Sequence, residues 1–234
     1  MKIYIVRHGQ STHNANQDVP HNPDPPLTEL GQMQAKFTAA ALKEELSLRP
    51  DALYASPQRR ALQTVRPIQE ALGLPAQILP DICEVGGLRE HHGMSRNQIL
   101  TEWPGVLPDS AITEEGWWRG GDADELEDVF YERAARAIQQ LRSRHQPKNG
   151  VGISGDTIVV VTHGRFGSAF VSTLLSQAPA GYSRYPFDNC GITCIDFDDY
   201  HRVAYAPKPP DLTLESIRLL FHNHQTHIPT AHRS

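Results

Sequence analysis

Short apolar runs alternate along this chain with longer segments in which apolar residues recur every three or four positions. The runs are rich in β-branched residues, which is typical of buried parallel strands, whereas the longer spacing is typical of amphipathic helices. Strands are expected at residues 2–6, 53–55, 77–79, 157–161, 191–197 and 202–206. Helices are expected at residues 28–47, 56–72, 126–141 and 166–175. The alternation predicts an α/β fold, a three-layer α/β/α sandwich with a mostly parallel central sheet.

Three positions predict where helices begin and end. Thr28 precedes an amphipathic run, and a threonine hydroxyl can accept a hydrogen bond from an amide of the first turn. Ser56 followed by Pro57 predicts a second helix start, because serine is a good cap and proline fits the first turn. Gly73 predicts the end of that helix, since glycine adopts the left-handed conformation common there.

The sequence predicts a single domain over residues 1–221 with one insertion. Residues 80–124 are weakly periodic and rich in Gly, Pro, Trp and charge, so we expect them to form an insertion over the sheet and the active site. Residues 222–234 contain four histidines and are expected to form a loosely ordered tail. Histidine-rich tracts can bind metals, but we interpret these four as features of a flexible tail.

Composition narrows the class of protein. The chain has 234 residues, with 22 Lys plus Arg against 27 Asp plus Glu, and this mild acidity argues against nucleic acid as the partner. Three cysteines make an odd count at spacings unlike a zinc framework, so we expect reduced thiols. No apolar stretch approaches the roughly 18 residues of a membrane span, and a strand is predicted from residue 2. We therefore expect a cytoplasmic protein with no membrane partner.

Two histidines follow predicted strands. The run at 2–6 leads into Arg7-His8-Gly9, and the run at 157–161 leads through Thr162 into His163-Gly164. Open α/β sheets bind their ligands at the carboxyl ends of parallel strands. A single histidine at such a position could be an ordinary buried imidazole, whereas two together predict a site.

Arginines near these positions indicate the kind of ligand. Arg7 provides a planar cation suited to phosphate, and Gly9 would let the backbone approach an anion closely. Arg59 and Arg60 lie in the first turn of a predicted helix, whose amides also favour anions. An isolated arginine pair is usually solvated, but these segments together predict a phosphate pocket.

Five segments resemble the histidine phosphatase superfamily, also called the phosphoglycerate mutase-like family. They are Arg7-His8-Gly9 with Asn14, Pro26 to Gly31, Ser56 to Thr64, Glu84, and His163-Gly164, spread over about residues 1–195. Each segment alone is a weak signal, whereas the ordered set is specific. The resemblance implies a phosphoglycerate mutase-like fold and a histidine acid phosphatase-like phosphomonoesterase.

The resemblance also implies roles for individual residues. It makes His8 the nucleophile that becomes phosphohistidine, with the phosphoryl group surrounded by Arg7, Arg60 and His163. Asn14 is expected to contact the same group, and Arg60 rather than Arg59 falls in the family's register. Further residues expected to bind substrate are Gly9, Gly164 and Arg165.

The chemistry supports these roles independently. A neutral imidazole can attack a dianionic phosphomonoester in line while flanking cations stabilise the equatorial oxygens. Because two arginines and a second histidine supply that stabilisation, we expect neither a metal ion nor another cofactor. The leaving oxygen needs a proton, and Glu84 is the expected donor, with Asp81 as a competing candidate.

Other residues have weaker signals. Arg165 could bind a second anionic group, and Glu125 with Arg133 matches an acid-to-arginine spacing of phosphatase members, or simply an ion pair. Residues of the insertion that could contact substrate, or only pack within the loop, are Arg89, His91, His92, Arg96, Trp117, Trp118 and Arg119.

Hydrolysis of a small phosphorylated substrate is the favoured activity. A mutase-type phosphoryl transfer is the nearest alternative, but the longer segment that follows the Glu84 position in that branch is missing. A non-catalytic phosphate-binding module on the same fold is the other alternative. The sequence does not identify the substrate, and it leaves a homodimer open.

Overall fold

A computed structural model of the protein describes residues 1–15, 22–88, 91–118, 125–145, 155–177, 184–199 and 215–234. The described residues form a seven-stranded sheet in the order β4-β3-β2-β5-β1-β6-β7. Its strands are β1 Lys2–Arg7, β2 Ala52–Ala55, β3 Ala76–Ile78, β4 Leu107–Pro108, β5 Thr157–Thr162, β6 Ile192–Asp199 and β7 Glu215–His224. The strands from β4 to β1 run parallel, whereas β6 is antiparallel to β1 and β7 to β6. The mostly parallel sheet is therefore confirmed.

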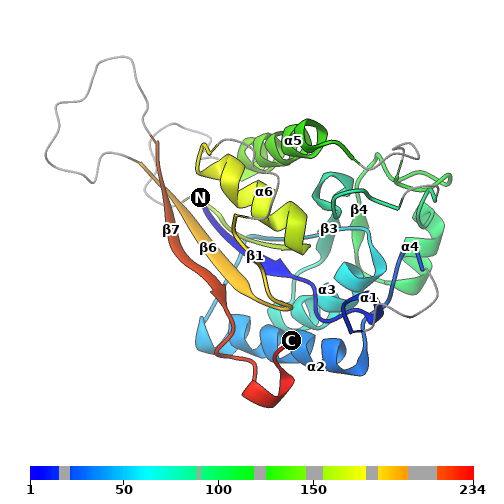
Figure 1. Ribbon diagram of the computed structural model, residues 1–234, viewed down its shortest axis with the longest axis horizontal. Helices are drawn as coiled ribbons and strands as arrows, with labels where there is room; N and C mark the ends of the chain where they lie inside the picture. The colour runs from blue at the N-terminus through cyan, green and yellow to red at the C-terminus, as the bar shows by residue number, and fades with distance from the viewer. Residues whose placement is uncertain (16–21, 89–90, 119–124, 146–154, 178–183, 200–214) are drawn as a thin grey trace, which may run out of the picture.

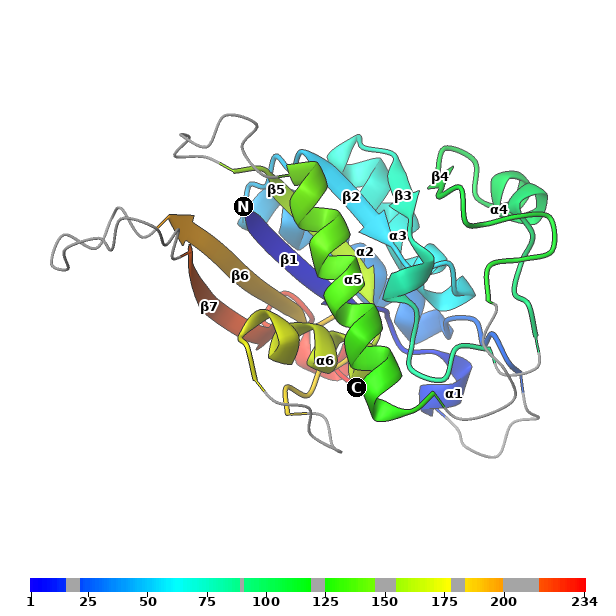
Figure 2. The ribbon, with the colours of Figure 1, turned by 90° about the horizontal axis from the view of Figure 1, so that it is seen from above.

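Helices cover both faces of this sheet. They are α1 Thr12–Ala15, α2 Glu29–Ala40, α3 Arg59–Leu72, α4 Arg96–Glu102, α5 Glu127–His145 and α6 Gly164–Leu174. Figure 1 shows α5 and α6 on one face and α2 and α3 on the other, and Figure 2 shows α5 and α6 crossing over the strands. This arrangement is the predicted α/β/α sandwich. None of these helices is long and apolar enough to cross a membrane, within the part of the chain that the structure describes.

The apolar runs lie in the sheet because their side chains fill two cores. In β1, Tyr4 and Val6 pack on the α2–α3 side, while Ile3 and Ile5 pack on the α5–α6 side. Successive side chains of a strand point to opposite faces, so a central strand covered by helices must be apolar at every position. This requirement explains the continuous apolar run.

The helix ends agree with the sequence at two of the three positions. Thr28 Oγ1 accepts the Gly31 N–H at 3.0 Å, and Gly73 ends α3 with a left-handed φ of 68°. Ser56, however, does not cap a helix. Gln58 is the N-cap of α3, and the buried Ser56 hydroxyl lies 2.7 Å from His163 Nε2. Ser56 is therefore part of the site at the strand ends.

The expected insertion belongs to the sheet and to the core. Pro80–Ile82 forms a 3₁₀ turn, α4 follows, and β4 pairs with β3 at the edge of the sheet. Buried side chains of this region that join the α2–α3 core include Leu88, Met94, Ile99, Trp103, Val106, Ile112 and Trp117. These apolar residues do not follow one period, which explains why their burial was not predicted.

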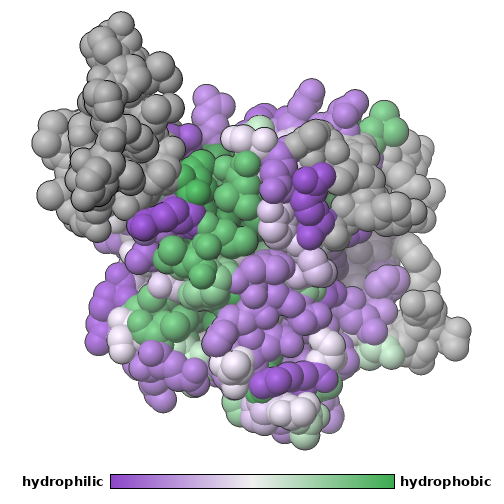
Figure 3. All heavy atoms as spheres, turned by 60° about the vertical axis from the view of Figure 1, so that its left-hand side comes forward, coloured by the Kyte–Doolittle hydropathy of each residue, from purple (hydrophilic) through white to green (hydrophobic). Residues whose placement is uncertain are grey.

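The C-terminal region also differs from the expectation. The predicted strand at 202–206 lies outside the described residues, and β7 pairs with β6 over 215–224, across the expected domain boundary. The chain then packs against α2, with Ile228 fully buried, and forms a 3₁₀ turn at Thr230–His232. Burial of Ile228 fixes this segment against the domain. Figure 3 brings the β6–β7 side forward and shows apolar side chains there, where Leu220 is 46% exposed.

Candidate active site

The two histidines lie together because β1 and β5 are neighbouring parallel strands. Arg7 pairs with Thr162 at the last position of the two strands, so His8 and His163 follow at the same edge of the sheet. Their ring centroids are 5.1 Å apart, and the side chains are 2% and 0% exposed. The strand pattern thus places two buried imidazoles side by side.

The hydrogen bonds of His8 assign its neutral tautomer. Nδ1 lies 2.7 Å from the Gly9 carbonyl, which can only accept, so Nδ1 carries the proton. Nε2 is then unprotonated and accepts a hydrogen bond from Arg60 Nε at 3.1 Å. Burial, followed by the positive charges of Arg60 and Arg7, lowers the pKa of His8 well below 6.5. His8 therefore has an unprotonated Nε2.

His163 is held neutral beside it. Burial, followed by the charge of Arg60, lowers the pKa of His163 well below 6.5. Its Nε2 lies 2.7 Å from Ser56 Oγ, whereas its buried Nδ1 has no hydrogen-bond partner among the described residues. If Ser56 donates to Nε2, Nδ1 carries a proton that can be donated to a ligand.

Arg7 and Arg60 supply positive charge at this position. Arg7 Nη1 donates to the Phe187 carbonyl at 2.5 Å, and its buried Nε has no partner among the described residues. Arg60 is 8% exposed, with Asp24 3.9 Å from its Nη1. Both arginines line the pocket described next, so each can donate further hydrogen bonds to an anion.

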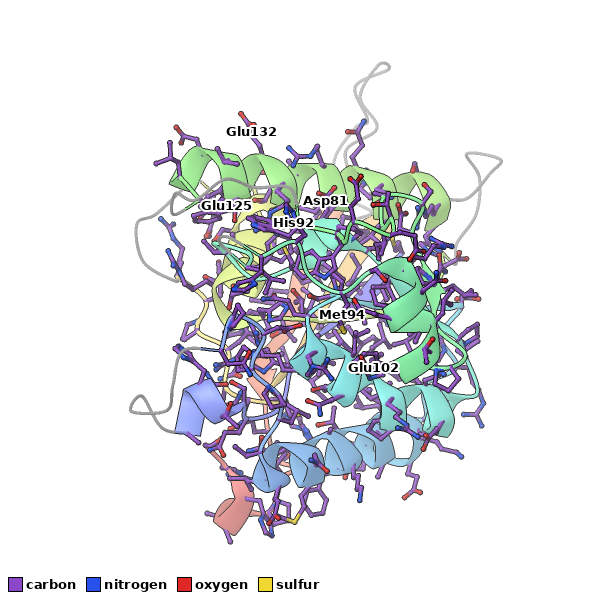
Figure 4. All side chains as sticks on the ribbon, turned by 90° about the vertical axis from the view of Figure 1, so that its right-hand side faces the viewer. Asp81, His92, Met94, Glu102, Glu125 and Glu132 are labelled. Atoms are coloured by element: carbon purple, nitrogen blue, oxygen red, sulfur yellow. The ribbon has the colours of Figure 1, made fainter. Side chains whose placement is uncertain are left out.

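Arg59 points elsewhere. Its Nη1 donates to Glu102 at 2.8 Å, and its Nη2 lies 3.6 Å from the sulfur of Met94. Figure 4 labels Met94 and Glu102 in the region where α3 and α4 come together. These contacts explain why only Arg60, one residue further along α3, faces His8.

A pocket of about 550 Å³ is lined by Arg7, Arg60 and His8. Its other lining residues include Ser11, Thr12, His13, Asn14, Asn22, Gln58, Glu84, Gly86, Leu88, Glu125 and Arg165. Most of these side chains are polar, and three arginines are among the lining residues. Such a pocket fits a small anionic molecule better than an apolar one.

Glu84 lies in the wall of this pocket. Its Oε1 accepts the Phe166 N–H at 2.9 Å and its Oε2 accepts the Arg165 N–H at 3.3 Å, both from the first turn of α6. Asp81, the competing candidate, does not line the pocket, and its carboxylate lies 3.8 Å from an arginine of α5. Of the two acids that the sequence offered as proton donor, only Glu84 lines the pocket.

Arg133 of α5 fixes the backbone around Glu84. Its guanidinium donates to the carbonyls of Asp81 at 2.9 Å and Cys83 at 2.8 Å. It also forms a two-bond pair with Glu125, at 2.8 Å and 2.6 Å. Figure 4 shows Asp81 and Glu125 beneath α5. The predicted ion pair is therefore a buried support for the loop that carries Glu84.

The two glycines expected at the site have different surroundings from each other. A Cβ at Gly9 would lie 2.4 Å from the Gly31 carbonyl oxygen, and the Gly9 N–H donates to Thr64 Oγ1 at 3.0 Å. Gly9 therefore lets the loop approach α2 and does not line the pocket. A Cβ at Gly164 would lie 3.4 Å from Arg7 Nε, so Gly164 leaves room beside that guanidinium.

The remaining candidates divide into those at the pocket and those away from it. Asn14 and the exposed Arg165 line it. Arg96 donates to three carbonyls of the α4–β4 region instead, and His91, His92, Trp117 and Trp118 do not line it. Arg89 and Arg119 lie outside the described residues. Within the described ranges, no group of three or more potential metal ligands comes together.

Several polar residues near the site were not identified from the sequence. Gln58 accepts the Glu84 N–H at 2.8 Å, and Asn189 donates to the His8 carbonyl at 3.1 Å. Gln34 accepts the Gln10 N–H at 2.8 Å. Two features of the sequence could have indicated them. Asn189 lies in a polar turn just before β6, and Gln34 is a polar residue on the buried side of α2.

Two neutral imidazoles follow the ends of parallel strands, with the half-buried Arg7 and the buried Arg60 beside them, in an α/β protein. This arrangement can bind an anion. A sequence model described as the histidine phosphatase superfamily (branch 1) matches residues 3–206. The chain therefore belongs to this superfamily, as its motifs indicated.

Some of the similar proteins are named as mutases and others as phosphatases. The chain is 27% identical to a probable phosphoglycerate mutase GpmB of Enterobacter sp., over 85% of this chain and 86% of that protein. It is 29% identical to phosphoglycerate mutase-like protein 4 of Arabidopsis thaliana, over 70% and 66%. A mycobacterial glucosyl-3-phosphoglycerate phosphatase structure with VO₃ has the same fold, with a TM-score of 0.65, 22% identity, and coverage of 96% and 99%. So does Entamoeba histolytica phosphoserine phosphatase with 3-phosphoglyceric acid, with a TM-score of 0.60, 20% identity, and coverage of 97% and 99%.

Proposed function

We propose that the protein hydrolyses a small phosphomonoester through a phosphohistidine formed on His8. The observation that carries this proposal is the state of His8: a buried, neutral imidazole whose unprotonated Nε2 lies 3.1 Å from a guanidinium in the lining of a polar pocket. An imidazole in this state can attack phosphorus, and the neighbouring cation can stabilise the oxygens as charge develops.

Three residues that line the pocket, and His163 buried beside His8, have complementary roles. Arg7 and Arg60 bind the equatorial oxygens, and His163 donates from Nδ1, which has no other partner among the described residues. Asn14 adds a neutral donor. These groups supply the charge stabilisation that a metal ion supplies in other phosphoryl-transfer sites, so the reaction proceeds without one.

Glu84 protonates the leaving oxygen and then activates water. It is the acid in the pocket wall whose carboxylate accepts an N–H of α6 and whose backbone carbonyl accepts from Arg133. In the first half-reaction the P–O bond to the leaving group breaks as the Nε2–P bond forms. In the second, water attacks phosphorus and phosphate departs from His8.

The substrate carries a second anionic group in this proposal. Arg165 lies at the pocket, is exposed, and has no ion pair among the described residues. The ligands of the Entamoeba enzyme, 3-phosphoglyceric acid and phosphoserine, both carry a carboxylate near the phosphate. A similar arrangement here would place the phosphate at His8 and the second anion at Arg165.

A screen of phosphate release over a broad panel of phosphorylated metabolites, with EDTA present, tests the proposal. We expect activity on one or more compounds that EDTA leaves unchanged, and loss of that activity in His8→Ala. Strict dependence on added Mg²⁺ or Zn²⁺, or full activity of the variant, would contradict it. Because the sequence relatives have mutase names, the panel includes phosphoglycerates assayed for isomer exchange. Exchange without phosphate release would favour the mutase.

A further inference from the structure

We propose that Asn189 and Gln34 are positioning residues, which couple the C-terminal segment 225–234 to the loop that carries His8 and Asn14. Both side chains are buried amides, 3% and 0% exposed. In each amide, one polar atom forms a hydrogen bond with the loop and the other forms one with the C-terminal segment. The role of Asn14 in phosphate binding rests on the proposed function, but the coupling itself is a property of the fold.

Asn189 fixes the orientation of Asn14. Its Nδ2 donates to the His8 carbonyl at 3.1 Å and to Asn14 Oδ1 at 3.2 Å. Asn14 Oδ1 also accepts from Ser11 N at 3.2 Å and Ser11 Oγ at 3.0 Å. Three donors thus converge on this oxygen, which leaves the NH₂ of Asn14 as the end available to the pocket. A phosphate oxygen needs that donor.

Gln34 fixes the next part of the loop. Its Oε1 accepts the Gln10 N–H at 2.8 Å. Its Nε2 donates to the His232 carbonyl at 2.7 Å and to Ser234 Oγ at 3.0 Å. All of these groups belong to one network, because Ser234 Oγ in turn donates to Asn189 Oδ1 at 3.3 Å. The hydroxyl of Ser234 therefore joins the two amides.

The C-terminal segment is itself anchored behind the loop. Ile228 is fully buried, and Gln225 Nε2 donates to the Asn189 carbonyl at 2.9 Å. Loss of the segment would leave one end of each buried amide without its partner, and a buried amide then rotates or draws in water. We infer that the segment holds the phosphate-facing donors of the loop in place.

Amide hydrogen exchange tests the coupling without substrate. Detaching the segment with Ile228→Asp should increase exchange of residues 8–15 by about tenfold, and Ser234→Ala should increase it by a smaller factor. Gln69→Ala is the matched control, because Gln69 makes a comparable bond to the Ala76 N–H at 2.9 Å away from the loop. Unchanged exchange in both segment variants, or an equal increase in Gln69→Ala, would overturn the proposal.

A double-variant cycle with inorganic phosphate tests the action through Asn14. Asn14→Ala and Asn189→Ala should each weaken phosphate binding, measured by titration calorimetry, by about three- to tenfold. The dissociation constant of the double variant should exceed that of Asn14→Ala by less than twofold. Without the Asn14 side chain, Asn189 has no donor group left to orient. Multiplicative effects would show that Asn189 does not act through Asn14. A wild-type protein that binds no phosphate would contradict the proposed function, while the exchange experiment would still decide the coupling.

Discussion

At His8, one backbone carbonyl decides which nitrogen can react. The Gly9 carbonyl accepts a hydrogen bond from the Nδ1–H, so the lone pair of Nε2 faces Arg60. In the proposed reaction, the Arg60 Nε–H exchanges its hydrogen bond to His8 Nε2 for one to a phosphoryl oxygen when substrate binds. The same guanidinium would therefore keep the nucleophile oriented before binding and stabilise the transferred group afterwards.

Glu84 and Arg60 should respond differently to the leaving group. If Glu84 protonates the departing oxygen, Glu84→Gln should slow phosphorylation by an alkyl phosphate by about 10²- to 10⁴-fold, but slow p-nitrophenyl phosphate far less. Arg60→Ala should slow both esters alike, because it removes stabilisation from the phosphoryl group itself. Rapid-quench measurement of phosphoenzyme formation compares the two.

Asp81→Asn is the control for this comparison. Asp81 lies outside the pocket, so its variant should keep the wild-type ratio of rates on the two esters. Equal losses on both esters in Glu84→Gln, or a leaving-group-dependent loss in Asp81→Asn, would remove Glu84 from the acid role.

The sequence identified the charged residues of the site more readily than the residues that orient them. His8 and His163 could be placed because each directly follows an apolar strand, and Arg60 followed from the family motif. No sequence pattern identifies Asn189 or Gln34. Their side chains contact the loop only because β6 pairs with β1 and α2 packs against the loop in the folded protein. Ser56 was assigned to a helix cap, since a cap and a histidine partner look alike in sequence.

Among the elements, length and period decided what could be predicted. The strands β1 and β5 were expected near their observed bounds because each is a continuous apolar run, and the helices α2, α3 and α5 because each has a helical hydrophobic period. Short elements were missed: α1 spans four residues and β4 two. β7 was also missed, since Glu215–His224 contains several polar residues and lies at the edge of the sheet.

The burial of His227 after β7 predicts a pH dependence of stability. Burial, followed by the charge of His224, lowers the pKa of His227 to about 4. The unfolded chain takes up this proton below about pH 6.5, so the folded state loses stability as the pH falls from 6.5 towards 4. For this group the loss should reach about 2 kcal/mol at pH 5.

Urea unfolding at pH 8 and pH 5 measures this dependence. His227→Gln should reduce the drop in the free energy of unfolding between the two pH values, compared with the wild type. His91→Gln is the control, because it removes an exposed imidazole outside the C-terminal segment. An unchanged drop in His227→Gln would contradict the assignment of a buried, neutral His227.

For the whole molecule, the fold brings four distant parts of the chain to one end of the sheet. β1 supplies Arg7 and His8, α3 supplies Arg60, the segment after β3 supplies Glu84, and β5 supplies His163. The turn before β6 and the C-terminal segment support this set from behind. Activity should therefore depend on the intact sheet as well as on the residues that touch phosphate.

The most direct test of the account is to locate the covalent phosphoryl group. The protein is mixed with a substrate found in the phosphate-release screen, quenched in alkali within milliseconds, digested, and mapped by mass spectrometry. The account predicts an alkali-stable, acid-labile phosphoryl group on His8, formed and consumed at rates that match turnover and missing from His8→Ala. Turnover with no phosphoenzyme, or with the phosphoryl group on another residue, would contradict it.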